Sequence, residues 1–360
     1  MNADSLELFF ELVRAGLWKN DVRLSEHEQI NWQEIYQLSC EQSVLGLMLA
    51  GLEHSDVKPP QVMLLQWIGE VQQTEQRNVG MNRFIGELFE KFNATGTKAV
   101  LVKGQGVAQC YNKPLWRSCG DIDLLMDGPN YEKAKSLLIP IAEKVENEDV
   151  IKKHLGLYVN DFLIELHGRM PFEISRRVDR VLDGVIERVC DNHTNGANDL
   201  QGVPIPKPEE HLIIVFTHFL HHFFVEGVGL RQVCDWARLL WCNRNNLDLS
   251  LLEKRVRGAG LMTEWKAFAS LAVDKLSMPI EAMPFYDSRF KVKGEKVLKR
   301  VLKSGNFGHN NDLSYRTRFK GVSYKIIATW RRFVDFASLV PMLPEDAPKF
   351  FFTYLFNKAK

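Results

Sequence analysis

Apolar residues recur every three or four positions along the first part of the chain, which is the spacing of one helix face. A first stripe lies between Leu6 and Val13, and a much longer one extends from about Gln61 to Asn93. The Pro59-Pro60 pair before the longer stripe is typical of a helix start. The pattern predicts an N-terminal helical region over residues 1–97.

The pattern changes at Lys98. Apolar runs at residues 98–102, 121–126 and 161–167 suit three short strands, the first of them buried. A glycine-rich turn, Gly104-Gln105-Gly106, leads from the first run into a short helix. Asn, Asp, Gly and Pro are frequent from Asp191 to Pro208, which predicts a loop or irregular hairpin and a boundary. Residues 98–207 are therefore predicted to form a small sheet core.

Helical spacing returns at Pro208, so residues 208–360 predict a second helical region. Its first helix carries His218, His221 and His222 on one side. These imidazoles can bind a transition metal, line a cleft or be satisfied core histidines. The apolar segment from Phe350 to Phe356 can pack on the core or touch a membrane surface.

Charge and composition narrow the class of protein. The 360 residues include 46 Lys and Arg against 45 Asp and Glu, so the net charge of +1 gives no strong signal for nucleic-acid binding. No apolar run approaches the ~20 residues of a membrane span, and the first residues lack the pattern of a signal peptide. The six cysteines form no Cys-x-x-Cys pair, as expected of buried thiols in a reducing compartment. A cytoplasmic protein is expected.

The candidate chemistry lies in the second strand and in the turn before it. Asp121 and Asp123 alternate with Ile122 and Leu124, so both carboxylates leave one face of the strand. Two carboxylates this close repel each other unless a cation lies between them, and Mg²⁺ is the fitting ion. Backbone N–H groups of the glycine turn can hold phosphate, and the preceding Lys103 can neutralise it.

These features carry a resemblance to a known family. Lys103-Gly104, Tyr111, Pro114, Arg117 and the segment Asp121 to Leu125 resemble the active-site signature of the nucleotidyltransferase superfamily with the polymerase-β-like fold, most of all its uncharacterised bacterial branch. The resemblance implies an α+β fold, with a small mixed β-sheet core between two helical regions. The widespread form of the turn has Gly-Ser or Gly-Gly where this chain has Gly104-Gln105.

The resemblance also implies roles for individual residues. Glu165 is the candidate for the third catalytic and metal-binding carboxylate beside Asp121 and Asp123, with an edge-strand glutamate facing water as the alternative. His167 is expected near the site, where metal ligation, a leaving-group contact and simple hydrogen bonding are all open. Arg117 is expected to neutralise phosphates or to pair with one of the two aspartates.

The implied activity is transfer of a nucleoside monophosphate from an NTP, ATP being the expected one, to an acceptor hydroxyl. Two Mg²⁺ or Mn²⁺ ions would assist it. The cofactor-binding residues are expected at the turn and the cleft wall: Lys103, Gly104, Gln105, Gly106, Arg117 and His167. The acceptor is open between a small molecule, a sugar, a protein and an RNA end, and the N-terminal helices can hold it or only pack. A degenerate nucleotide-binding or interaction module is the alternative.

Overall fold

The computed structural model describes residues 3–27, 29–308, 310, 321–341, 343 and 346–358. The N-terminal region is helical, as predicted: α1 (Ala3–Trp18), the 3-10 turn η1 (Leu24–Glu26), α2 (Trp32–Glu41), α3 (Leu45–Glu53) and α4 (Gln61–Ala94). Asn31 caps α2 by accepting a hydrogen bond from the backbone N–H of Glu34. Pro60 precedes the first residue of α4, where its fixed φ suits a helix entry.

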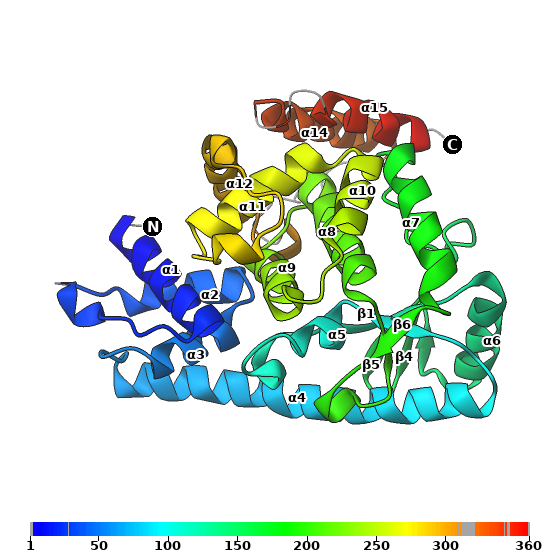
Figure 1. The fold of residues 1–360 in the computed structure, drawn as a ribbon, viewed down its shortest axis with the longest axis horizontal. Coiled ribbons are helices and arrows are strands. Elements are labelled where there is room, and N and C mark those ends of the chain that lie inside the picture. The colour runs from blue at the N-terminus through cyan, green and yellow to red at the C-terminus, as the bar shows by residue number, and fades with distance from the viewer. Residues whose placement is uncertain are drawn as a thin grey trace.

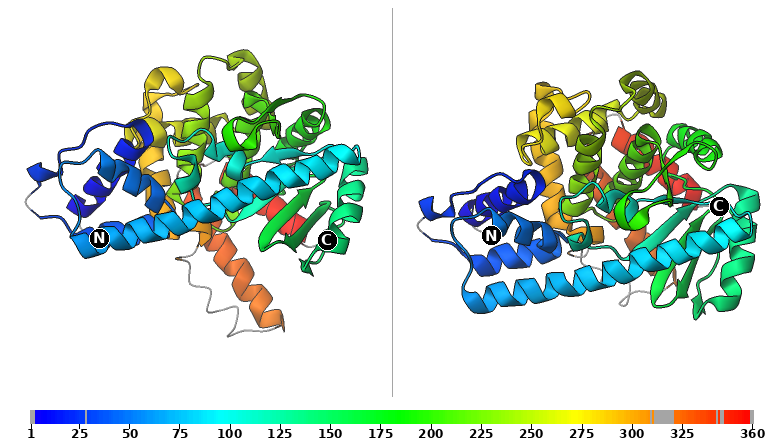
Figure 2. Two further views of the ribbon diagram at one scale, coloured as in Figure 1. Left: turned by 90° about the horizontal axis from the view of Figure 1, so that it is seen from below. Right: turned by 60° about the horizontal axis from the view of Figure 1, so that its bottom comes forward.

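Helix α4 runs along one whole side of the molecule, from the N-terminal helices to the sheet (Figures 1 and 2). Its first half buries Trp67 and Val71 in a helical core. Its second half buries Phe84 and Leu88 in a separate core against the sheet. The phenyl rings of Phe84 and Phe162 stack with centroids 5.5 Å apart, so α4 covers one face of the sheet.

The sheet has five strands in the order β1-β2-β5-β4-β3. They are β1 (Val100–Val102), β2 (Asp121–Leu125), β3 (Lys144–Val145), β4 (His154–Val159) and β5 (Phe162–His167). Only β2 and β5 run parallel, and the other pairs are antiparallel, which confirms the α+β fold with a small mixed sheet. Because β5 lies between β2 and β4, the alternative that Glu165 belongs to an edge strand is wrong.

Short elements surround the sheet. They are α5 (Gly104–Ala108), η2 (Pro114–Trp116), α6 (Gly128–Leu138), η3 (Ile139–Ile141), α7 (Arg176–Val189), β6 (His193–Asn195), η4 (Asn198–Leu200) and β7 (Pro204–Pro206). Strands β6 and β7 pair antiparallel, which confirms the irregular hairpin predicted before Pro208.

The C-terminal region is helical as well: α8 (Pro208–Val225), α9 (Leu230–Asn243), α10 (Leu249–Ala259), α11 (Met262–Asp274), α12 (Lys291–Ser304), α14 (Gly321–Leu339) and α15 (Asp346–Lys358), with 3-10 turns η5 (Ile280–Ala282), η6 (Ser288–Phe290) and η7 (Asn306–Gly308). Phe216 of α8 packs against both Trp236 and Trp265, with ring centroids 5.3 and 4.8 Å away. Burial of three large rings stabilises this helical core by several kcal/mol, at roughly 25 cal/mol per Å².

Helices α14 and α15 lie together at one side of the molecule (Figure 1). Phe350 is buried, and its ring centroid lies 4.8 Å from that of Phe224 on α8. This contact confirms that the start of the apolar C-terminal segment packs on the core. None of the helices that the structure describes combines the length and the apolar character needed to cross a membrane.

Candidate active site

The register of the sheet brings the predicted carboxylates together. Asp123 of β2 is the direct partner of Glu165 on β5, and Asp121 lies two residues earlier on the same face. Ile122 and Leu124 alternate with the aspartates, so their side chains lie on the opposite face of β2, where they are buried. One carboxylate oxygen each from Asp121, Asp123 and Glu165 lies within 4.8 Å of the others. Local alternation and strand pairing thus build an acidic cluster from two neighbouring aspartates and a glutamate more than 40 positions later in the sequence.

The cluster is electrostatically strained. The charge of Asp123, followed by burial, raises the pKa of Asp121 to about 6. Carboxylate oxygens are the ligands that Mg²⁺ and Mn²⁺ prefer. A hard divalent cation therefore fits the donor set and would relieve the repulsion.

Lys103 reaches this cluster from the turn after β1. Its Nζ lies 2.5 Å from Asp123 Oδ1, and both side chains are largely buried. Burial lowers the pKa of Lys103, but the charges of Asp123, Asp121 and Glu165 outweigh that effect and raise it. Its backbone φ of 55° is rare for a residue with a side chain, and such strain persists only where the surroundings enforce it.

Gly104 follows with a φ of 34°, and a Cβ there would lie 3.1 Å from Cys119 Sγ and 3.4 Å from the Asp121 carbonyl oxygen. A glycine therefore suits this position, because the turn passes close to the start of β2. The first backbone N–H groups of α5 have no intrahelical partner by geometry.

His167 lies at the end of β5 on the acidic face. Its Nε2 is 2.8 Å from Asp123 Oδ1 and 3.5 Å from Glu165 Oε2. Burial lowers the pKa of His167, but its hydrogen bond with Asp123 and its contact with the Glu165 carboxylate raise the pKa overall. Of the three predicted roles, the structure shows hydrogen bonding. His167 and Lys103 both contact the Asp123 carboxylate.

Arg117 lies at the wall of the cleft, but it pairs with neither Asp121 nor Asp123. Its Nε and Nη2 each donate to a carboxylate oxygen of Asp235 on α9, both at 2.7 Å. Tyr111 also donates to Asp235, at 2.8 Å. Burial raises the pKa of Asp235, but Arg117 outweighs it and lowers the pKa overall. Both charges are buried, so this fork ties the sheet core to the C-terminal helices.

Gln105 and Gly106 are placed differently from the rest of the turn. The Gln105 side chain is buried against α4, where its Nε2 donates to Asn78 Oδ1 at 2.8 Å. A Cβ on Gly106 would approach Leu101 and His211. Neither residue lines the cleft that contains Lys103 and the carboxylates. Any contact of these two residues with a nucleotide must therefore use the backbone.

The carboxylates open into a cleft whose empty space is about 850 Å³, including open solvent. Its far wall comes from α8 and α9 and includes His218, His222 and Arg231. His218 Nδ1 lies 3.5 Å from Lys103 Nζ. Burial, followed by the charge of Lys103, lowers the pKa of His218 well below its usual value. Two of the three predicted α8 histidines therefore line the cleft.

A family model described as an uncharacterised nucleotidyltransferase matches residues 28–274. The chain belongs to this nucleotidyltransferase family. The match includes the turn, all five strands of the sheet and the cleft wall from α8 and α9. No curated protein matches the chain significantly, and no solved structure does either.

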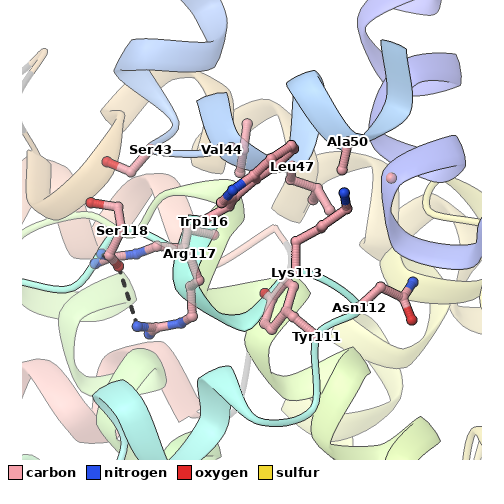
Figure 3. A pocket seen from close by; sticks show the side chains of 13 residues that line it. Ser43, Val44, Leu47, Ala50, Tyr111, Asn112, Lys113, Trp116, Arg117 and Ser118 are labelled. Carbon is pink, nitrogen blue, oxygen red and sulfur yellow. Dashed lines mark hydrogen bonds between the residues drawn. The ribbon is translucent and has the colours of Figure 1, made fainter. Parts of the chain in front are cut away.

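A second, smaller pocket adjoins the cleft of this nucleotidyltransferase family member. Figure 3 shows it between the residues around the start of α3, Ser43 to Ala50, and the segment from Tyr111 to Ser118. Its empty space is about 400 Å³, including open solvent, and it shares Arg117 and Arg231 with the main cleft. Arg231 Nη1 donates to the Ser118 carbonyl oxygen at 2.7 Å. The N-terminal helices therefore reach the edge of the site.

The prediction of site residues from sequence missed His154. Its Nε2 lies 3.4 Å from Glu165 Oε2, because His154 and His167 are direct partners across β4 and β5. The signal was present: Leu155, Leu157 and Val159 alternate, which extends the strand back to His154 and puts it on the polar face. Although burial raises the pKa of Glu165, its contacts with His154 and His167 lower it overall.

Proposed function

We propose that this chain moves a nucleoside monophosphate from an NTP, with ATP as the expected donor, to an acceptor hydroxyl. The observation that carries the proposal is the convergence of Asp121, Asp123 and Glu165 with Lys103 in one cleft of a nucleotidyltransferase family member. We also propose the finer assignment to a polymerase-β-like core. The acceptor class stays open between a small molecule, a sugar, a protein and an RNA end.

Asp121, Asp123 and Glu165 would hold divalent cations, Mg²⁺ or Mn²⁺. Their three hard oxygen donors fit such ions, and the raised pKa of Asp121 reflects a repulsion that bound positive charge would remove. Two bound ions would supply stabilisation of the attacking and leaving oxygens in an in-line displacement.

The turn and the cleft wall would hold the triphosphate. Lys103 neutralises Asp123 in the structure, and its ammonium group can instead contact a phosphate once the carboxylates are otherwise neutralised. The backbone N–H groups of Gly104, Gln105 and Gly106 would contribute directed donors. Arg231 lines the cleft and would add positive charge beside them. His167 would keep the Asp123 carboxylate oriented toward the site.

A degenerate nucleotide-binding module is the second candidate. It is favoured by one observation: the residue at the position of the usual turn serine, Gln105, directs its side chain to Asn78 and away from the cleft. Such a module would bind an NTP but would not transfer the nucleotide.

The test is to incubate the protein with each labelled NTP and Mg²⁺ or Mn²⁺, alone and with cell extract. We expect label transfer that falls ~10³-fold or more in an Asp121→Asn/Asp123→Asn variant. Asp199→Asn, which changes an exposed aspartate in η4, serves as the matched control and should retain activity. Transfer that survives the double substitution contradicts the proposed metal site. A metal-dependent thermal shift with ATP but no transfer supports the binding module.

A further inference from the structure

A second group of potential metal ligands lies on the same face of the sheet, beside the acidic cluster. It consists of His154, Glu165 and His167, whose donor atoms all lie within 4.8 Å of one another. Sheet register creates it, because His154 faces His167 across β4 and β5 and Glu165 lies two residues before His167 on one strand. In the part of the chain that the structure describes, this is the one potential ligand group that contains histidine.

The distances between the donor atoms suit ligands of one cation. Glu165 Oε2 lies 3.4 Å from His154 Nε2 and 3.5 Å from His167 Nε2. A strong charge-assisted hydrogen bond between such groups is about 2.7–2.9 Å long, and both contacts are longer than that. Donor atoms at about 2.1 Å from a tetrahedral Zn²⁺ lie about 3.4 Å apart. Both contacts therefore have the length of an edge between two ligands of one ion.

The three donors also leave room for a further ligand. They line a cavity of about 1080 Å³, including open solvent, which lies beside the main cleft and contacts it at Glu165, His218 and His222. The side chains of His154, Glu165 and His167 are 35%, 25% and 9% exposed, so the His154 side is open to this cavity. Three protein ligands with one open position are the arrangement of reactive zinc sites.

We propose that His154, Glu165 and His167 form a site for a borderline transition ion such as Zn²⁺. Two imidazoles select such an ion over Mg²⁺, whereas the neighbouring aspartates favour the harder ion. Glu165 belongs to both groups. An ion on His167 Nε2 displaces its hydrogen bond to Asp123, which keeps its contact with Lys103. The proposal goes beyond nucleotidyl transfer and does not depend on it.

The test is Co²⁺ and Zn²⁺ binding to the full chain after removal of metals by dialysis against a chelator. Co²⁺ reports a tetrahedral site by intense visible absorption, and equilibrium dialysis gives the stoichiometry and affinity for Zn²⁺. We expect one tight equivalent of Zn²⁺ per chain. His154→Ala should weaken binding at least ~100-fold, because loss of an outer-shell partner alone weakens metal sites 10–100-fold. His154→Gln provides a second variant of similar size, and circular dichroism checks that both variants fold.

Matched variants separate this site from other donors and from the proposed function. His193→Ala, at an exposed histidine of β6, should leave binding unchanged. Asp121→Asn should retain the Co²⁺ spectrum even though it should abolish transfer. Three results would overturn the proposal: no binding, binding insensitive to both His154 variants, or binding lost instead in His222→Ala or Cys242→Ser.

Discussion

Lys103 Nζ lies 2.5 Å from Asp123 Oδ1, and both side chains are almost completely buried. A lysine from the glycine turn thus neutralises the central member of a group of three carboxylates. The contact joins the two parts of the sequence signature, which are 20 positions apart. It also connects the stability of the metal-free protein to the charge at the site.

Substitution Lys103→Met should therefore lower the free energy of unfolding of the metal-free protein. Removing one partner of a buried pair leaves the other charge uncompensated, which costs about 3 kcal/mol. We further expect millimolar Mg²⁺ to restore part of the loss, because a cation between the carboxylates replaces the missing ammonium charge. Urea denaturation with and without Mg²⁺ measures both effects.

The control for this prediction is Lys98→Met. Lys98 pairs with Asp191, but their side chains are 61% and 72% exposed. An ion pair that is exposed to water contributes little to stability, so this variant should unfold nearly as the parent does. Equal losses in the two variants, or no response of Lys103→Met to Mg²⁺, would contradict the role given to Lys103.

Asp121→Asn should make the metal-free protein more stable in a pH-dependent way. The pKa of Asp121 is about 6 in the folded protein against 3.8 ordinarily, so the folded state binds this proton more tightly. The stabilisation that the folded state gains by binding this proton is present below pH 4 and is lost as the pH rises from about 4 to about 6. The variant should show no gain below pH 4 and a gain of up to about 3 kcal/mol above pH 6. Denaturation at a series of pH values in the presence of a chelator measures the difference.

Asp199→Asn tests whether removing any acidic group has the same effect. Asp199 is exposed in η4, so its substitution should change stability little at any pH. A gain in Asp121→Asn that does not vary with pH would show that it arises from something other than the repulsion by Asp123.

The buried ion pair between Arg117 and Asp235 predicts a loss of stability that does not depend on metal. Both side chains are 7% exposed, so Arg117→Met should lower the free energy of unfolding by about 3 kcal/mol. Arg117→Lys keeps the charge but not the two parallel bonds, and should recover only part of this. The matched control is Arg169→Met, since Arg169 also contacts both carboxylate oxygens of one aspartate, Asp183, but with side chains 44% and 41% exposed. Chemical denaturation that ranks Arg169→Met as the more damaging change would refute the prediction.

Much of the site follows from patterns that are local in the sequence. Alternation at residues 121–125 predicts that Asp121 and Asp123 share a face, and the structure has them there. The turn of Lys103 and Gly104 is likewise recognisable, because a glycine-rich turn after an apolar run is a short-range signal. The helical regions follow from stripes that are long enough to be unambiguous, as in α4.

The remaining parts depend on which segments meet in space. The partner of Arg117 is Asp235, 118 positions away, and no local pattern specifies that pairing. Of the two roles expected for Arg117, the pairing with Asp121 or Asp123 was wrong for this reason, and a contact with phosphate stays a prediction. His154 joins the site only through the register of β4 and β5, and Gln105 turns away only because Asn78 of α4 passes behind it. Register and helix docking are decided by the packing of the whole core.

Substitution of Gln105 should affect the stability of the protein without affecting its affinity for nucleotide. Its side chain is buried and donates to Asn78 Oδ1 at 2.8 Å, so Gln105→Ala should lower the free energy of unfolding by about 1–3 kcal/mol. Because the side chain does not line the cleft, the affinity for ATP and Mg²⁺ should change less than about 3-fold at temperatures where the variant is folded. Asn78→Ala removes the same hydrogen bond from the other side, together with the bonds from Asn78 Nδ2 to the carbonyl oxygens of Leu115 and Arg117, so it should lower the stability further. Calorimetry measures affinity and denaturation measures stability. A large loss of affinity in Gln105→Ala without one in Asn78→Ala would mean that this side chain contacts the nucleotide directly.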